Sequence, residues 1–156
     1  MRSLLILGVF VLLSVNAPAQ AGDDPLAEWA NCHICKVMLP HMAELMPVIK
    51  HELVTLDNGC ATLTTVTDPA KLESYHQMCK AMHKAGEESA SFTKEEASAQ
   101  LCPMCQKMWV LMADGAHLSY GLTSRGDMLV LSSEDPEIQA RIVALWKEYE
   151  QMMPGS

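Results

Sequence analysis

The pattern of apolar and polar positions predicts two β-hairpins. Residues 51–66 consist of two runs of β-branched and apolar side chains on either side of Asn58 and Gly59. An Asn-Gly turn between two such runs is the strongest short-range hairpin signal. Residues 117–131 repeat this arrangement around Gly126. We therefore expect two pairs of antiparallel strands.

Each hairpin leads into an Asp-Pro pair that predicts the start of a helix. Asp68 and Asp135 each lie nine positions after the turn glycine, and a proline follows each of them. An aspartate at the N-cap with proline at the first helical position favours helix initiation. We expect helices from residue 69 to about 85 and from residue 136 to about 152. Each carries an apolar stripe at helical spacing, formed by Leu72, Tyr75, Met78 and Met82 in one and by Ile138, Ile142, Leu145 and Tyr149 in the other.

A helix with a Cys-X-X-Cys motif near its start is expected before each hairpin. In the first half, Pro25 opens this helix and Pro40 kinks or ends it. In the second half, Thr93 and Glu96 form a capping-box pattern that opens a short helix leading to the motif. Pro103 then stands between the two cysteines as a suitable first helical residue.

These elements predict an α+β fold made of two tandem helix–hairpin–helix halves. We expect a first half over residues 22–86, a linker over 87–91 and a second half over 92–156. One hairpin with two helices buries little apolar surface alone, so the halves are expected to pack about a pseudo-twofold axis as one compact domain. The result is a four-stranded antiparallel sheet with helices on one face. Two separate half-domains are the alternative.

The first residues predict an export signal. Arg2 precedes an apolar run over residues 4–15, and small residues offer a cleavage site after Ala21. This pattern is typical of a secretory signal peptide over residues 1–21. We therefore expect a periplasmic or secreted protein with no membrane segment after cleavage.

Composition narrows the classes of partner. The chain has 156 residues, with 19 acidic residues against 11 basic ones. Removing the signal takes Arg2 and leaves ten basic residues against nineteen acidic ones, a net charge of −9. A surface this acidic argues against nucleic acid as the main partner. It is compatible with a metal ion or another exported protein.

One arrangement of cysteine and methionine occurs twice. Each copy is a Cys-X-X-Cys motif with methionines three and seven positions after its second cysteine, which places these three residues on one helix face. Thiolate and thioether sulfurs are soft ligands, so the arrangement predicts a copper or zinc site. The predicted ligands are Cys32, Cys35, Met38 and Met42 in the first copy and Cys102, Cys105, Met108 and Met112 in the second.

Two other states of the Cys-X-X-Cys pairs stay open. The chain has six cysteines, and an even number in an exported protein is typical of disulfides. A pair at a helix N-terminus can also have lowered thiol pKa values and exchange disulfides. Both motifs resemble those of thioredoxin-like oxidoreductases over these four residues alone. That fold requires a strand directly before the motif, and no strand is expected before either one here.

Further candidate ligands lie outside the two motifs. His76, Cys79 and His83 have the spacing of one helix face and form a secondary metal candidate. Cys79 has a competing role, because a disulfide with Cys60 would staple a helix to the sheet. His51 and His117 open the first strand of each hairpin and are candidates for a shared ligand role.

The leading hypothesis is an exported protein that binds or delivers Cu(I) or Zn(II) through the two Cys-X-X-Cys motifs and their neighbouring methionines. No catalytic residue is predicted. The alternatives are a thiol–disulfide oxidoreductase of an extracytoplasmic compartment and a disulfide-stapled binding module without catalytic activity.

Overall fold

The computed structural model describes residues 25–152. The predicted signal peptide therefore lies outside the described residues. In chain order the elements are α1 (Pro25–Asn31), the 3-10 helix η1 (Cys35–Val37), α2 (Leu39–Leu45), η2 (Met46–Val48), β1 (Ile49–Leu56), β2 (Gly59–Val66), η3 (Pro69–Lys71), α3 (Leu72–Ser89), α4 (Lys94–Gln100), α5 (Pro103–Ala113), β3 (His117–Thr123), β4 (Gly126–Ser132) and α6 (Pro136–Met152).

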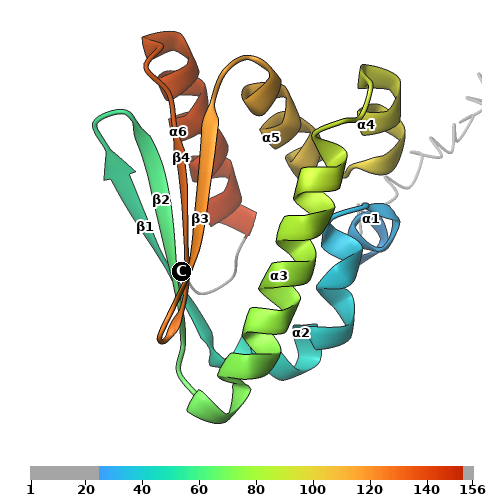
Figure 1. The fold of residues 1–156 in the computed structure, drawn as a ribbon, viewed down its shortest axis with the longest axis vertical. Coiled ribbons are helices and arrows are strands. Elements are labelled where there is room, and N and C mark those ends of the chain that lie inside the picture. Colours follow the sequence, from blue (N-terminus) through green and yellow to red (C-terminus); the bar gives the residue numbers. More distant parts are fainter. Residues whose placement is uncertain (1–24, 153–156) are drawn as a thin grey trace, which may run out of the picture.

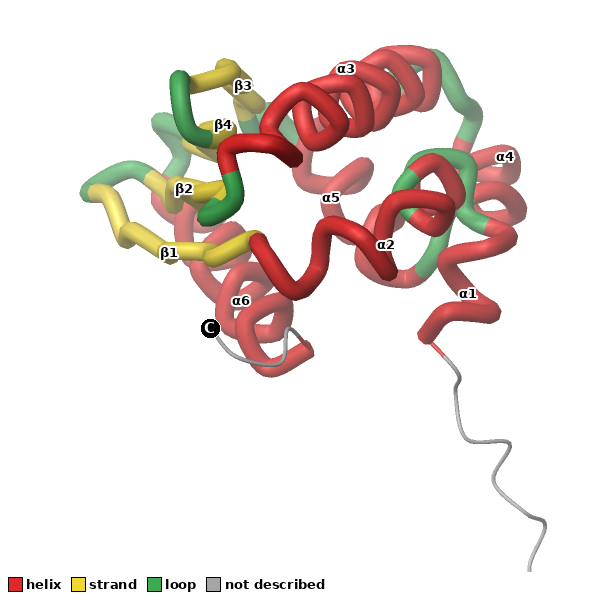
Figure 2. The backbone as a smooth tube through the Cα atoms, turned by 90° about the horizontal axis from the view of Figure 1, so that it is seen from below, coloured by secondary structure: helices red, strands yellow, loops and turns green. Residues whose placement is uncertain are grey.

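The four strands form one antiparallel sheet in the order β1-β2-β4-β3. The two hairpins meet along the central pair β2–β4. All the described helices lie on one side of this sheet, and they leave its other side uncovered (Figures 1 and 2). The predicted α+β class, with an antiparallel sheet and helices on one face, is confirmed.

The strand pairing repeats at a constant separation along the chain. Thr62 of β2 pairs with Leu129 of β4, which is 67 positions later. Gly59 and Gly126, the first residues of these strands, are also 67 positions apart. The pairing within each hairpin follows the same offset. This regularity supports a pseudo-twofold between two duplicated halves, which stays a prediction.

Two helices divide the covered face of the sheet. Ile142 of α6 packs with Leu131 of β4 in one apolar cluster. Tyr75 of α3 packs with Val66, the last residue of β2, in a second cluster that includes Leu45 of α2. A third cluster joins the region of α1 and η1 to α4 and α5, away from the sheet. This third cluster surrounds the candidate site.

The first Cys-X-X-Cys motif is not at the start of a helix, contrary to expectation. α1 ends at Asn31, and the motif forms a turn that runs into η1. Pro40 does not end a helix, because it lies in the first turn of α2. A proline is tolerated there, since the first N–H groups of a helix have no intrahelical partner. The single continuous helix predicted here is therefore two short helices separated by the motif.

The second half agrees more closely with the prediction. Thr93 and Glu96 form the capping box that starts α4, and Cys102 is the N-cap of α5 with Pro103 following it. α6 has the predicted bounds. In the first half, α3 continues to Ser89, so its last turn occupies the first part of the predicted linker.

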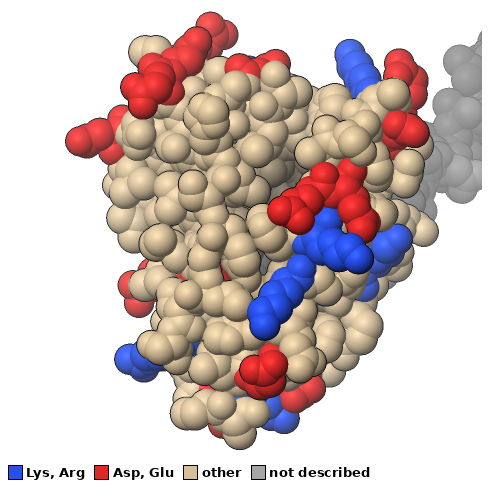
Figure 3. All heavy atoms as spheres, viewed as in Figure 1, with Lys and Arg blue, Asp and Glu red and all other residues tan. Residues whose placement is uncertain are grey.

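The surface shows no continuous basic patch on the face drawn in Figure 3, where acidic and basic side chains lie close together over α3. The strand β3 carries no Lys, Arg, Asp or Glu. Among the described helices, none is both long enough and apolar enough to cross a membrane.

Gly126 should be essential to the central strand pair. A Cβ atom at this position would lie 1.9 Å from the carbonyl oxygen of Thr64 on β2. The variant Gly126→Ala must therefore displace backbone, and we expect the free energy of unfolding to fall by about 1–3 kcal/mol or more. Urea denaturation measures this change.

Gly121 of β3 is the matched control, because a Cβ atom there would meet nothing within 4 Å. Gly121→Ala is expected to change stability by no more than about 0.5 kcal/mol. Equal losses in the two variants would show that the close approach of β2 and β4 is not the cause.

Candidate metal centre

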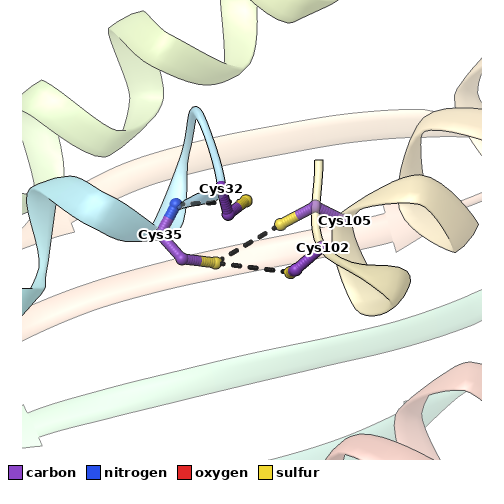
Figure 4. Close-up of side chains that lie close together, drawn as sticks. All are labelled: Cys32, Cys35, Cys102 and Cys105. Carbon is purple, nitrogen blue, oxygen red and sulfur yellow. Dashed lines mark hydrogen bonds between the residues drawn. The ribbon is translucent and has the colours of Figure 1, made fainter. Parts of the chain in front are cut away.

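Four cysteines from distant parts of the chain lie together in the interior. The Sγ atoms of Cys32, Cys35, Cys102 and Cys105 all lie within 4.8 Å of one another. Cys35 Sγ is 3.5 Å from Cys105 Sγ and 3.7 Å from Cys102 Sγ. Figure 4 shows the four side chains pointing toward a common centre from two separate segments. The structure therefore brings together all four predicted thiol ligands.

The spacing of these sulfurs matches the requirements of a single tetrahedral ion. A zinc–sulfur bond of about 2.3 Å places the sulfurs of a tetrahedron about 3.8 Å apart. The shortest contacts, at 3.5 and 3.7 Å, are close to this edge length. A disulfide needs about 2.05 Å between sulfurs, and all six described cysteines are free thiols. The donor set and its spacing fit a metal ion.

Each motif presents its thiols through a different local structure. In the first motif, the chain turns after α1, and the backbone N–H of Cys35 points at Cys32 Sγ at 3.5 Å. In the second motif, Cys102 is the N-cap of α5 and Cys105 lies in the first turn of that helix. Peptide N–H groups and a helix N-terminus both stabilise negative sulfur. The two backbones therefore favour a thiolate at Cys32 and at Cys102, the form that a metal requires.

His33, inside the first motif, attaches the turn to the rest of the molecule. Its backbone N–H donates to the carbonyl oxygen of Gln100 at 2.7 Å. Its ring lies 3.1 Å from the carboxylate of Glu88 on α3 and packs edge-on against Phe92. These contacts hold the turn against α3 and α4. The turn is thus positioned by the second half of the chain as well as by its own sequence.

Gln106 and Trp109 perform a similar role for the second motif. The side-chain amide of Gln106 donates to the carbonyl oxygens of Leu101 at 2.7 Å and Ser98 at 3.2 Å. The indole N–H of Trp109 donates to the carbonyl oxygen of Ser89 at 3.0 Å. These hydrogen bonds fix the start of α5 relative to α3 and α4, and so they fix Cys102 and Cys105.

The centre is enclosed by apolar side chains. Cys32 is 1% exposed and Cys102 is 5% exposed, while Cys105 is half-buried. Partly buried apolar residues pack around the cysteines, namely Trp29, Ile34, Met38, Phe92, Met104 and Trp109. Such surroundings exclude water and strengthen electrostatic interactions at the sulfurs.

The four thiols strongly influence one another's pKa values. Hydrogen bonds, first from Cys102 and then from Cys105, lower the pKa of Cys32, and a hydrogen bond from Cys105 lowers the pKa of Cys102 to about 7. The pKa values of Cys35 and Cys105 are raised, first by their hydrogen bonds to Cys102. Sulfurs that share protons in this way concentrate negative charge, which favours a cation at their centre.

The predicted methionine ligands are not gathered at the sulfurs. Met38 packs against the four-cysteine cluster, but Met108 packs against the core under α6. Met112 is 38% exposed, and Met42 is half-buried in α2 without belonging to any of the described core clusters. The matched sequence spacing therefore places only one of the four methionines beside the thiols. Met104, between the second pair of cysteines, also packs there, and the methionine spacing did not single it out.

The secondary metal candidate on α3 is not assembled. His76 Nε2 donates to the carbonyl oxygen of Gly126 at 3.0 Å, whereas His83 stacks on Tyr120 and lies 3.5 Å from Glu87. Cys79 faces the carboxylate of Asp127 at 4.0 Å. Within residues 25–152, the four cysteines are the one group of three or more potential ligands close enough to share an ion.

The possible Cys60–Cys79 disulfide is not formed, because both cysteines are free thiols. Cys79 lies beside Asp127, which pairs with Thr64 on β2. Cys60 is four positions from Thr64 along the same strand, a distance of roughly 13 Å. Two cysteines whose Cα atoms are more than about 7 Å apart cannot be bridged without moving the backbone. Each thiol instead fills its own apolar cluster.

His51 and His117 do not share a role, because they are on opposite faces of the sheet. The 67-residue offset relates His51 to Leu118, and Leu118 packs against the core under α6. His117 is one position earlier and is exposed. His51 faces the helices, where its Nδ1 lies 3.1 Å from the hydroxyl of Thr64 and its Nε2 is buried without a hydrogen-bond partner. A one-residue slip in register reverses the face.

Comparison of the chain with protein-family models, curated proteins and solved structures gives no match. Its function is therefore inferred from the four-cysteine geometry and the surroundings of that centre.

His51 should make stability depend on pH. Burial lowers its pKa below the ordinary value of 6.5, and the opposing charge of Asp127 offsets this only in part. The unfolded chain therefore binds a proton at a higher pH than the folded chain does. The stability present above pH 6.5 is lost as pH falls below 6.5 toward the folded pKa.

Urea unfolding of the reduced protein at pH 7.5 and 5.5 tests this expectation. His51→Gln removes the titrating group, so the variant should lose less stability than the parent between the two pH values. An identical loss in variant and parent would show that His51 is not the source of the pH dependence.

Proposed function

We propose that this protein binds one soft metal ion, with Zn(II) as the preferred ion, through Cys32, Cys35, Cys102 and Cys105. The observation that carries the proposal is the convergence of four thiols whose mutual distances fit one tetrahedral ion. In a cofactor with several metal atoms, the cysteines would bind different metal atoms, and their sulfurs would lie farther apart than the four sulfurs here.

The donor set favours zinc over copper. Four thiolates in a tetrahedral arrangement are typical of Zn(II), whereas Cu(I) is selected by soft sulfur ligands in general. The thioethers that would favour copper are mostly elsewhere, with Met108 under α6 and Met112 exposed. Copper is therefore the second candidate, and direct metal analysis distinguishes the two.

The closed form of the centre favours stable retention of the ion. Three of the four thiols are buried, and a tetrahedral ion bound here would have all four positions taken by protein sulfur. Four-ligand zinc sites of this kind are structural, while catalytic sites keep one position open. A bound ion would join the segment after α1 to the start of α5. We propose that its role is to stabilise the fold through this link.

The two alternatives have less support in the geometry. A dithiol oxidoreductase must bring a nucleophilic sulfur against the disulfide of a partner protein, whereas three of the four sulfurs are buried and Cys105 is half-buried. A disulfide-stapled module needs paired cysteines, whereas all six are free among the described residues. We also propose an extracytoplasmic location, which rests on the signal-like first residues. Metal coordination would protect four free thiols in such an oxidising compartment.

Metal analysis is the first test of the proposed function. The protein purified under reducing, anaerobic conditions should bind one equivalent of zinc. Cys35→Ser and Cys102→Ser each remove a ligand. Affinity in a chelator competition should fall by more than the roughly 10- to 100-fold typical of losing a residue that only supports a ligand.

Cys60→Ala and Cys79→Ala are the matched controls, because both remove a buried thiol outside the centre. They should retain one equivalent of metal at the parental affinity. Unchanged stoichiometry and affinity in Cys35→Ser and Cys102→Ser would contradict the proposed site.

Metal should also stabilise the fold. An ion that binds only the folded chain adds about 2.7 kcal/mol at a free concentration 100 times its Kd. Thermal unfolding should therefore shift to higher temperature when zinc is added to the metal-free, reduced protein. The Cys102→Ser variant should show a much smaller shift at the same zinc concentration. An equal shift in both proteins would place the stabilising ion elsewhere.

A further inference from the structure

Cys105 differs from the other three cysteines of the centre in its accessibility. Cys32, Cys35 and Cys102 are buried, whereas Cys105 is half-buried on the first turn of α5. Oxidation of cysteine follows the exposure of the sulfur as well as its thiolate character. When an ion is bound, all four sulfurs are deprotonated, so exposure is what distinguishes them, and a small oxidant arriving from solvent reaches Cys105 before the other three sulfurs.

The sulfur placed to react next belongs to the other motif. Cys35 Sγ lies 3.5 Å from Cys105 Sγ, the shorter of its two contacts with the second motif (Figure 4). Forming a bond of about 2.05 Å requires the two sulfurs to approach by about 1.5 Å. Cys35 is the first residue of the short 3-10 helix η1, and Cys105 lies in the first turn of α5, so a shift of these two segments would bring the sulfurs together.

We propose that the centre is a redox-controlled metal site, in which a peroxide-class oxidant joins Cys35 to Cys105 and thereby releases the ion. The inference rests on the proposed function, because it concerns the regulation of the same four cysteines. Loss of two of its four ligands leaves the ion with only Cys32 and Cys102, which no longer close a tetrahedron.

The chemistry uses two electrons from the protein. The Cys105 sulfur attacks one oxygen of hydrogen peroxide, the O–O bond breaks, and water leaves after taking up a proton, which gives Cys105 sulfenic acid. The Cys35 sulfur then attacks the Cys105 sulfur, the S–O bond breaks, and a second water leaves with a second proton. The two sulfurs are oxidised to a disulfide, and one peroxide is reduced to two waters. A thiol reductant reverses the change.

The two remaining cysteines of the chain are suited to be internal controls. Cys60 and Cys79 are buried in separate clusters. Burial raises the pKa of the Cys60 thiol, and it raises the pKa of Cys79 to about 11. Both are therefore neutral thiols in the folded protein near neutral pH, and they should stay unmodified while the centre is oxidised.

The test treats the full-length zinc-loaded protein with hydrogen peroxide and follows released zinc with a chromogenic chelator. Bound zinc is measured before the oxidant is added. We expect one zinc ion to be released per disulfide formed, and a non-reducing peptide map should join the Cys35 peptide to the Cys105 peptide. Addition of dithiothreitol and zinc should restore the original stoichiometry.

Two variants sharpen the result. Cys105→Ser, studied at a saturating zinc concentration, should release zinc more slowly than the parent and cannot form the mapped cross-link. Cys60→Ala should release zinc at the parental rate with the same cross-link. Because the cross-link is mapped in the parent protein, the test does not depend on either variant folding.

The outcomes separate the two proposals. Zinc that is bound but retained through oxidation overturns the redox control and leaves the proposed function standing. Release with pairs formed only within each motif overturns the assignment to Cys35 and Cys105. A reduced protein that takes up no zinc or copper contradicts the proposed function before oxidant is added, and the redox control fails with it.

Discussion

The close approach of four thiols in an apolar interior is the constraint on which the candidate site depends. Negative sulfurs within 4.8 Å of one another repel, and the surrounding side chains exclude the water that would screen them. Shared protons or a cation must offset that repulsion. The N–H of Cys35 and the N-terminus of α5 supply part of the compensation, and an ion bound by all four sulfurs would supply the rest.

The centre and the sheet link the same two halves at two separate places. At the sheet, β2 and β4 share backbone hydrogen bonds, and the neighbouring face is filled by α3 and α6. At the centre, the contacts are between sulfurs, with His33 and Gln106 fixing the backbones on either side. Hydrogen bonding and packing therefore position the thiols from outside the centre. These contacts hold the four thiols close to the arrangement that an ion needs, so the site is largely preformed.

Local signals predicted the fold well because each rests on chemistry within a few residues. The Asn58-Gly59 turn, the capping box at Thr93 and the N-cap position of Cys102 all follow from local backbone requirements. The four thiols were predicted as ligands, but only the packed halves show that both pairs share one centre. Three of the four predicted methionine ligands lie away from the thiols, because helical spacing also serves ordinary cores, as Met108 shows. His51 and His117 failed because a shift of one residue reverses the face of a strand.

A metal held by both motifs would also alter the topology of the chain. Cys35 and Cys102 are 67 positions apart, so an ion bound by both closes a ring that contains the first hairpin, α3 and α4. In the loop-entropy description, closing a ring of this size lowers the conformational entropy of the unfolded chain, which corresponds to a free energy of about 4 kcal/mol. The ion would thus act as a cross-link between the two ends of this ring. A chain cut once inside the ring would still be a single covalently and coordinatively connected molecule.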